Sequence, residues 1–201
     1  MKHNSEVVKR KYNRISHVYN WMDKMIKAEW RKQLLNDLHG NILEVGIGTG
    51  SNIKYYPNGI HLTGIDFSPG MLKYARREAK NVSFPIRLIE MDAQKMKFEN
   101  ITFDFVVATC VYCSVPNPIK GMEEMKRVCK PNGRILLLEH MRSENPILGK
   151  VMDLLNPLVV GTYGANINRR TMTNIDKAGL KVEKEEQLLG TIMRRLVLKS
   201  D

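Results

Sequence analysis

The chain has 201 residues, of which 43% are hydrophobic and 26% charged, and its formal net charge is +11. This length and composition argue against a disordered chain and predict one globular domain with a buried core. No apolar run approaches the ~20 residues of a membrane span, and residues 1–20 lack the apolar core of a signal peptide. The positive charge suits nucleic acid, an anionic membrane or an acidic substrate, or serves solubility alone.

Residues 12–38 precede the main pattern and form a predicted amphipathic helical segment. Apolar side chains recur there at helical spacing, from Ile15 and Val18 to Met22 and Ile26. Residues 1–40 are also the most basic part of the chain for their length, with nine basic and four acidic side chains. We expect lid helices in residues 1–38, with a basic outer face for an anionic membrane surface. Simple packing on the sheet is the alternative.

From residue 41 onward, short apolar runs alternate with stretches of helical period. The predicted strands are 41–45, 61–66, 84–92, 103–111, 134–140, 180–189 and 191–200, and the predicted helices are 50–56, 68–79, 117–130 and 171–179. Apolar strands separated by helices indicate a parallel sheet covered on both faces. The last two strands alternate in polarity and flank a turn at Gly190, which predicts an antiparallel pair. The expected fold is therefore α/β, a doubly wound Rossmann-like sheet of seven strands with an antiparallel C-terminal edge.

Residues 146–160, PILGKVMDLLNPLVV, lie outside this alternation. They are strongly apolar, and we expect Pro157 to break them, because proline disrupts a helix interior. This segment and residues 12–38 are both candidates to cover the carboxyl ends of the strands, where open α/β sheets bind their ligands.

A glycine loop follows the first strand, in the stretch NILEVGIGTGS. Gly46, Gly48 and Gly50 allow the backbone to approach a ligand where a Cβ atom would clash. A dinucleotide fingerprint would need a glycine where Ser51 stands, and the lysine of a phosphate-binding P-loop is missing. Glu44 favours a ligand with a cationic amine over a pyrophosphate, which a carboxylate repels.

Two more acids end the next two strands. Asp66 ends the second strand, where a carboxylate can accept hydrogen bonds from both hydroxyls of a ribose. Asp92 and Ala93 end the third strand, at the place for an adenine amino group. Each acid has an alternative role as a helix cap or turn former, but together with the glycine loop they indicate an adenosine-bearing ligand.

Cys110 and Cys113 form a C-x-x-C pair after the fourth strand. A structural zinc site needs about four ligands, and the sequence has no second pair of this kind, so we expect no metal. A redox pair would lie at the start of a helix, whereas these cysteines end a strand. Three cysteines in all favour a reducing cytosol over a disulfide framework.

Five ordered stretches resemble the motifs of class I S-adenosylmethionine-dependent methyltransferases: LEVGIGTG, LTGIDFSPGML, EMDAQKMKF, FDFVVATCVYCSVPNP and MKRVCKPNGRILLLEH. The resemblance covers residues 12–180 and includes an N-terminal lid motif in YNRISHVYNWMDKMI. Ser16 and Asn20 depart there from the usual Ala and Asp. Within the family, the chain is similar to the branch of quinone C-methyltransferases, bacterial phosphatidylethanolamine N-methyltransferases and alkyl-thiol methyltransferases. The resemblance implies one methyltransferase domain over residues 1–201, with lid helices in 1–38 and a cofactor-binding core in 39–201.

The resemblance also implies site residues for S-adenosylmethionine. The methionine part would lie beside Glu44, Gly46, Gly48 and Gly50, and the adenosine part beside Asp66, Phe67, Met71, Asp92 and Ala93. Cys110 and Val111 would line the sulfonium, and Tyr19, together with Tyr12, would close over the cofactor from the lid.

Methyl transfer needs alignment of donor and acceptor, and a protonated acceptor benefits from a base. His140, after the fifth strand, is the first candidate base, with a structural role as the alternative. Tyr19 is placed with it in the catalytic set. Tyr112 is expected in the acceptor pocket or in the core. Arg169 and Arg170 are candidates to bind a phosphate, with a solvated helix face as the alternative.

These observations predict methyl transfer to a small amphiphile, first of all the amine headgroup of a phosphatidylethanolamine-type lipid. A thiol or a quinone-like ring is the alternative acceptor. From another class, the charge allows an RNA-binding module, although we expect no appended RNA-binding domain, and a cofactor-binding protein without catalysis is a further reading. We expect a cytoplasmic monomer or homodimer, with contact to the inner membrane face through the basic lid.

Overall fold

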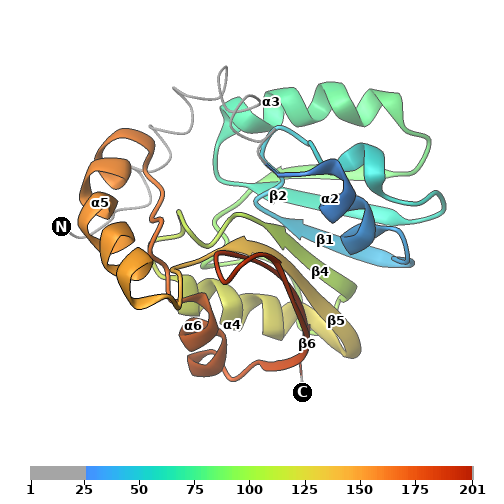
Figure 1. Ribbon diagram of the computed structural model, residues 1–201. Helices are drawn as coiled ribbons and strands as arrows, with labels where there is room; N and C mark the ends of the chain where they lie inside the picture. Colours follow the sequence, from blue (N-terminus) through green and yellow to red (C-terminus); the bar gives the residue numbers. More distant parts are fainter. Residues whose placement is uncertain (1–25, 201) are drawn as a thin grey trace.

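A computed structural model describes residues 26–200, and its strands form one seven-stranded sheet. The sheet lies between two layers of helices (Figure 1). The strands are β1 (Asn41–Val45), β2 (His61–Asp66), β3 (Ile86–Glu90), β4 (Phe103–Thr109), β5 (Cys129–His140), β6 (Lys181–Leu189) and β7 (Met193–Lys199). Their order across the sheet is β3-β2-β1-β4-β5-β7-β6. The pairs among β1 to β5 are parallel, and β7 pairs antiparallel with β5 and β6. The predicted fold class is confirmed.

The helices and short 3-10 turns fill the connections between strands. They are α2 (Ala28–Leu35), η1 (Ile53–Tyr55), α3 (Pro69–Glu78), η2 (Ala79–Asn81), α4 (Pro118–Val128), α5 (Pro146–Tyr163) and α6 (Thr171–Lys177). Ser68 caps α3 by accepting a hydrogen bond from the Met71 N–H, and Pro69 occupies the first helical position, as the sequence predicts.

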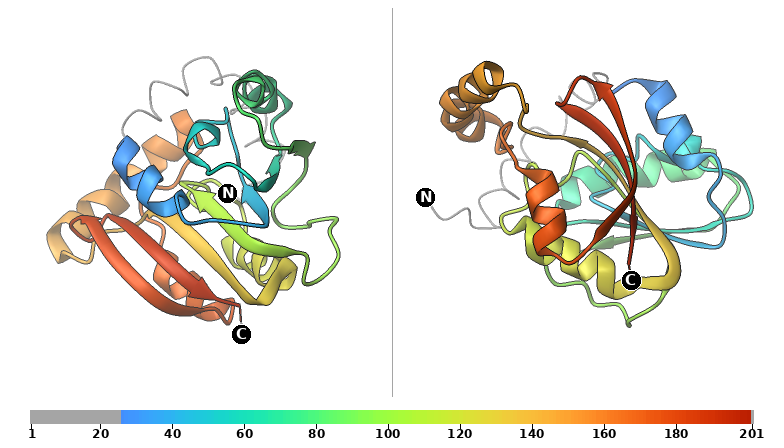
Figure 2. Two further views of the ribbon diagram at one scale, coloured as in Figure 1. Left: turned by 90° about the vertical axis from the view of Figure 1, so that its right-hand side faces the viewer. Right: turned by 60° about the horizontal axis from the view of Figure 1, so that its bottom comes forward.

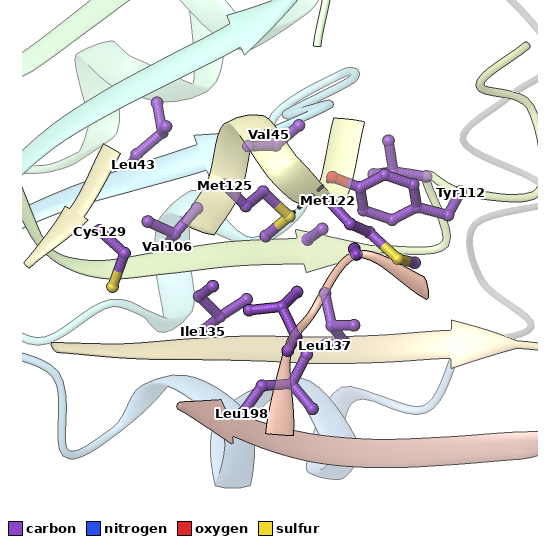
Figure 3. Close-up of a cluster of buried hydrophobic side chains, with 14 of the residues drawn as sticks. Leu43, Val45, Val106, Tyr112, Met122, Met125, Cys129, Ile135, Leu137 and Leu198 are labelled. Carbon is purple, nitrogen blue, oxygen red and sulfur yellow. Dashed lines mark hydrogen bonds between the residues drawn. The ribbon is translucent and has the colours of Figure 1, made fainter. Parts of the chain in front are cut away.

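Each strand sends alternate side chains to opposite faces of the sheet, and each face has its own core. One core includes Val45, Ile135 and Leu137 and packs against α4 and α6. The other includes Ile42, Leu136 and Leu138 and packs against α2 and α3. Figure 3 shows part of the first core, with strand residues facing methionines of α4.

The chain reverses its direction of winding between β1 and β4. It runs from β1 outward to β3 and then crosses to β4 on the other side of β1. Open α/β sheets bind ligands at such a switch point, beyond the carboxyl ends of the strands. The glycine loop after β1 and the cysteine pair after β4 both lie there.

Two segments differ from their predictions. Pro157 does not break the segment around it, since α5 runs unbroken from Pro146 to Tyr163. The exposed position of Pro157 leaves the carbonyl that loses its hydrogen bond open to water. Strand β5 begins at Cys129 instead of residue 134, because KPNG forms an irregularity in its pairing with β4.

Helix α5 stands apart from the two helical layers, at the end of the sheet where β5 finishes (Figures 1 and 2). Between residues 26 and 200, no helix combines the length and the apolar character needed to cross a membrane. The lid residues Tyr12 and Tyr19 lie outside the described residues, and so does most of the predicted 12–38 stripe.

Candidate active site

A pocket opens at the switch point, above the carboxyl ends of β1, β2, β3 and β4. Its lining consists of Gly46, Gly48, Ile65, Asp66, Phe67, Met71, Met91, Asp92, Ala93, Gln94, Cys110, Val111, Ser114, Val115 and Pro116. Most of the residues expected to surround the cofactor therefore share one pocket. Glu44 and Gly50 are the described exceptions.

The glycine loop needs its glycines for backbone shape and for close packing. Gly46, Gly48 and Gly50 all have positive φ, at 66°, 58° and 86°, a region that favours glycine. A Cβ atom on Gly46 would lie 2.6 Å from a methyl group of Val111. The loop is thus packed directly against the segment that follows β4.

Asp66 is buried at the end of β2, and backbone groups fix its carboxylate. Its Oδ2 accepts a hydrogen bond from the Gly48 N–H at 3.0 Å, and its Oδ1 accepts one from the Ser68 N–H at 2.8 Å. Burial raises the pKa of Asp66 to about 6, although these two bonds lower it. An ionised carboxylate has about four acceptor positions, so two are available to ligand hydroxyls.

Asp92 and Ala93 follow the carboxyl end of β3 and form one rim of the pocket. The carboxylate of Asp92 accepts hydrogen bonds from the Gln94 N–H and from the Gln94 side-chain amide, each at 2.9 Å. Gln94 in turn accepts a hydrogen bond from the Asn117 N–H at 2.9 Å, which ties this rim to the start of α4. The Asp92 carboxylate thus stabilises a turn, which is the alternative role expected from the sequence, and Asp92 also lines the pocket.

Glu44 is buried on β1, and its side chain points to the face of the sheet opposite to that of Leu43 and Val45. It accepts hydrogen bonds from Asn52 Nδ2 at 2.7 Å and from the Tyr56 hydroxyl at 3.1 Å. Together with Gly46, Gly48 and the buried Arg31, it lines a smaller cleft beside the glycine loop. Arg31 donates a hydrogen bond to Asn52 Oδ1. The Glu44 carboxylate is therefore held by a network of hydrogen bonds beside the glycine loop, next to the main pocket.

The loop after β4, residues 110–115, is held by the end of β5. Cys110 has φ 53°, unusual for a residue other than glycine, and its N–H bonds to the Leu138 carbonyl. The next two N–H groups, of Val111 and Tyr112, both donate to Glu139 Oε1, at 2.8 and 3.2 Å. Glu139 was not identified from the sequence. A signal was present, because strand alternation places this acid on the same buried face as the apolar Ile135 and Leu137.

The two thiols of the C-x-x-C pair serve this loop as hydrogen-bonding and packing groups. Cys113 Sγ donates to the Cys110 carbonyl at 3.3 Å. Burial raises the pKa of Cys113 to about 12 and that of Cys110 well above its ordinary value, so both are thiols at neutral pH. Across residues 26–200, no group of three or more metal-ligating side chains comes together.

Tyr112, expected in the acceptor pocket or in the core, lies in the core. It is almost fully buried, and its hydroxyl faces the Met125 sulfur at 2.7 Å (Figure 3). The positive φ of Cys110 turns the chain, so Val111 faces the glycine loop and Tyr112 points towards α4. Tyr112 therefore supports the pocket from below and does not line it.

His140 and the two arginines do not line the pocket. His140 follows the parity of Leu136 and Leu138, and partial burial lowers its pKa. Arg169 donates to the Val115 carbonyl at 2.7 Å, whereas Arg170 is exposed. Both arginines line a second cavity of about 370 Å³, together with Arg142 and Thr171.

The main pocket fits an adenosine-bearing ligand on its own chemistry. The fixed Asp66 carboxylate keeps acceptor positions, the apolar Ile65, Met71 and Met91 suit the faces of a base, and the glycine loop brings backbone close to the cavity. These features match the needs of S-adenosylmethionine, and Cys110 and Val111 belong to the lining of the same cavity.

Comparisons with known proteins agree with this geometry. Residues 43–137 match the family model described as a methyltransferase domain. A phosphatidylethanolamine N-methyltransferase of Cereibacter sphaeroides is 34% identical over 71% of this chain and 72% of its own length. A demethylmenaquinone methyltransferase of Staphylococcus haemolyticus is 28% identical over 78% of this chain and 67% of its own length.

Solved structures show the same fold. An S-adenosylmethionine-dependent methyltransferase from Thermotoga maritima superposes with a TM-score of 0.71, at 19% identity, covering 96% of this chain and all of that one. Another from Methanosarcina mazei gives 0.66 at 17% identity, over 87% of this chain and 97% of that one. With the relative at 34% identity and the pocket at the switch point, the chain belongs to the S-adenosylmethionine-dependent methyltransferases.

Proposed function

We propose that this methyltransferase binds S-adenosylmethionine in the switch-point pocket and methylates an amphiphilic acceptor at a bilayer surface. The first acceptor to test is the amine headgroup of phosphatidylethanolamine, the lipid named in the Cereibacter relative. The cofactor supplies an electrophilic methyl group, so the chain has to bind, align and shield the two reactants. The observation that carries the proposal is the outer face of α5.

Helix α5 presents a continuous apolar face to solvent. Ile147, Leu154 and Leu158 are 77%, 79% and 68% exposed, and with Val151 they follow the i, i+4, i+7, i+11 spacing of one helical face. Leu148 and Leu155 widen this face on one side. No other segment within residues 26–200 covers it. Large exposed apolar patches mark interaction sites on soluble domains.

The helix is attached to the loop that lines the pocket. Asn156 on its inner face accepts a hydrogen bond from the Ile167 N–H at 2.9 Å. Next to it, Asn166 donates both its N–H and its side-chain amide to the Cys113 carbonyl, at 2.8 and 3.0 Å. The helix that carries the apolar face is therefore linked by hydrogen bonds to the loop that lines the pocket.

Charge favours a lipid surface over a second copy of the chain as the partner of this face. The net charge of +11 repels another copy and is attracted to anionic headgroups. Lys150 is exposed beside the apolar face, and Arg170 is exposed after the helix. An apolar helical face bordered by basic side chains is typical of helices that lie in a membrane interface.

Replacing Ile147, Leu154 and Leu158 with serine should reduce binding to vesicles of phosphatidylethanolamine and phosphatidylglycerol by roughly ten-fold or more, because three apolar side chains no longer enter the interface. Co-sedimentation measures the bound fraction. The matched control replaces Val182 and Leu189 on β6, which are also exposed, with serine. The control should bind vesicles like the natural chain, and both variants should keep their affinity for S-adenosylhomocysteine.

Transfer of a labelled methyl group to phosphatidylethanolamine in the same vesicles tests the acceptor. Absence of vesicle binding by the natural chain, or equal binding by the α5 variant, would contradict the role of α5. Vesicle binding without labelled lipid would keep the surface and reject this acceptor. An RNA-binding control in the same buffer checks the reading that the positive charge serves nucleic acid.

We propose further roles for the residues around the pocket. Asp66 would hold the ribose hydroxyls, with Phe67, Met71 and Ala93 around the adenosine. Glu44 would attract the cationic amine of the cofactor, and Cys110 with Val111 would exclude water beside the sulfonium. Tyr12 and Tyr19 keep their expected roles in the lid as predictions from the sequence.

His140→Ala should lower turnover by about 100-fold or more if the imidazole accepts the proton of an ammonium headgroup, while the affinity for S-adenosylhomocysteine stays unchanged. Its lowered pKa keeps the ring neutral, and able to accept a proton, at pH 7. His61→Ala, at the exposed amino end of β2, is the matched control. A normal rate for the His140 variant would assign this histidine to structure.

Arg169 and Arg170 are proposed to hold the phosphate of a lipid acceptor. Guanidinium groups pair with phosphate in a planar, two-bond geometry. Desolvation lowers the pKa of Arg169, which means that its charge lacks full compensation in its present surroundings. The second cavity is the place where an anionic group would supply that compensation.

A quinone-like ring is the second candidate acceptor. It is favoured by the Staphylococcus haemolyticus relative, whose name refers to demethylmenaquinone, at 28% identity. The apolar face of α5 serves a lipid-soluble ring as well as a phospholipid. The same labelled-methyl assay with a demethylated quinol in the vesicles distinguishes the two acceptors.

A further inference from the structure

Glu139 is a fully buried carboxylate next to the pocket, and only one of its oxygens is used. Oε1 accepts the two N–H bonds from Val111 and Tyr112. Oε2 is buried and has no hydrogen-bond partner among residues 26–200. A buried carboxylate with a free oxygen is expensive, since its charge has lost the solvation of water. Such a group is rarely kept for packing alone, because a glutamine would make the same two bonds through one oxygen.

Contacts lead from Glu139 directly to the cofactor pocket. The carboxylate holds the Val111 backbone, and the Val111 side chain packs against Gly46 in the glycine loop. Cys110, Val111, Ser114 and Val115 line the pocket, whereas Glu139 itself does not. Glu139 therefore acts on a ligand through the loop that it holds and through its charge.

The groups around Glu139 leave its charge only partly balanced. From the loop after β4, Cys110, Tyr112 and Cys113 face it, and burial raises the pKa of all three, so they are neutral. Arg169, from the segment after α5, is the cation that lowers its pKa, and no ion pair joins the two. Arg194 is the residue opposite Glu139 on β7, but its guanidinium forms ion pairs with Glu144 and Glu185 instead. His140 follows it on β5 but points to the other face of the sheet.

We propose that Glu139 is a positioning residue whose buried negative charge makes the pocket favour a cationic ligand over a neutral ligand of the same shape. The inference rests on the proposed binding of S-adenosylmethionine and deepens it. The sulfonium of the cofactor carries a positive charge that the thioether of the product S-adenosylhomocysteine lacks. A fixed negative charge beside Cys110 and Val111 would therefore hold the substrate form and weaken the hold on the product.

The preference should depend on pH. Desolvation raises the pKa of Glu139 to about 7, against the opposing effects of its two backbone bonds and of Arg169. Glu139 is therefore mostly protonated at pH 6.0 and ionised at pH 8.5. Asp66, with a pKa of about 6, also titrates in this window, but it faces the adenosine that both ligands share. Its effect cancels when the two affinities are divided.

The test is the ratio of the affinities for S-adenosylmethionine and S-adenosylhomocysteine, measured by calorimetry without acceptor or turnover. In the natural chain this ratio should rise by roughly three- to ten-fold between pH 6.0 and 8.5, as expected for two charges several ångströms apart in a medium of intermediate dielectric. In Glu139→Gln the ratio should be low and flat. Glutamine keeps the two bonds to Val111 and Tyr112, so a purely structural role predicts no change in the ratio.

Glu123→Gln is the matched control, because it removes one negative charge from the exposed face of α4. Its ratio should follow that of the natural chain. Equal ratios in the natural chain and the Glu139 variant would overturn the inference. If the variant does not fold, a flat ratio in the natural chain alone would overturn it. Failure of the natural chain to bind either ligand would remove the cofactor assignment as well, whereas failure to methylate lipid would leave this inference intact.

Discussion

Asp66→Ala should weaken the binding of S-adenosylhomocysteine by roughly 1–3 kcal/mol, or about five- to 150-fold, because ribose hydroxyls lose their acceptor in a buried site. In the natural chain the Asp66 carboxylate accepts the Gly48 and Ser68 N–H groups and so fixes the glycine loop relative to β2. The variant also loses this support. Affinity in the natural chain should also fall as the pH drops through about 6, since protonation turns one acceptor oxygen into a donor. Calorimetry at pH 5.0 and 7.5 measures both effects.

Asp104→Ala is the matched control for this experiment. Asp104 is also a carboxylate that accepts a backbone N–H, from Asn41 at 2.8 Å, and it pairs with Lys130 at 2.7 Å. It lies at the amino end of β4, across the sheet from the pocket. Its loss should lower stability and leave the ligand affinity unchanged. Equal affinities for the Asp66 variant and the natural chain would remove Asp66 from the site.

The pocket was predictable from the sequence because its residues belong to strand ends. Gly46, Asp66 and Asp92 lie at the end of a strand or just after one, and parallel pairing brings the carboxyl ends of those strands to one edge. The pattern of strands and helices sets this arrangement without any knowledge of side-chain contacts. Local motifs and the topology of the sheet therefore point to the same site.

The sequence carries less information where the backbone departs from regular geometry. Cys110 adopts a positive φ, which no feature of a cysteine predicts, and this turn sends Tyr112 into the core. Pro157 normally predicts a break, but the exposure of α5 lets water satisfy the released carbonyl. In both cases the outcome depends on the surroundings of the residue in the folded chain, which its type alone does not reveal.

Glu139 is a different case, because a signal for it exists in the run RILLLEH. Alternation along β5 assigns Ile135, Leu137 and Glu139 to the same apolar face. A single acid at the end of such a face is either exposed to solvent or buried with hydrogen-bond partners. Which of the two occurs depends on the loop after β4, whose N–H groups point towards the carboxylate only in the folded chain.

Glu139→Gln should stabilise the chain more at pH 8 than at pH 4. The difference in the free energy of unfolding between the variant and the natural chain should be about 3 kcal/mol larger at pH 8. The carboxyl pKa goes from 4.5 in the unfolded chain to about 7 in the folded chain. Between these values the folded state binds more protons than the unfolded state, so the natural chain loses stability as the pH rises from about 4.5 to 7. Glutamine does not titrate and escapes this loss.

Thermal unfolding of both chains without ligand, at pH 4, 6 and 8, measures the difference. Glu124→Gln is a control of opposite sign, because hydrogen bonds from Arg127 lower the pKa of Glu124. Its carboxylate stabilises the fold above its ordinary pKa, and this contribution is lost as the pH falls, so the variant should be weakened at pH 8 and not at pH 4. If the stability difference between the Glu139 variant and the natural chain did not grow with pH, the natural carboxylate would ionise without destabilising the fold. Its charge would then already be balanced in the folded chain. A gain would mean that the chain retains a destabilising charge beside its cofactor pocket, as expected of a group kept for ligand selection.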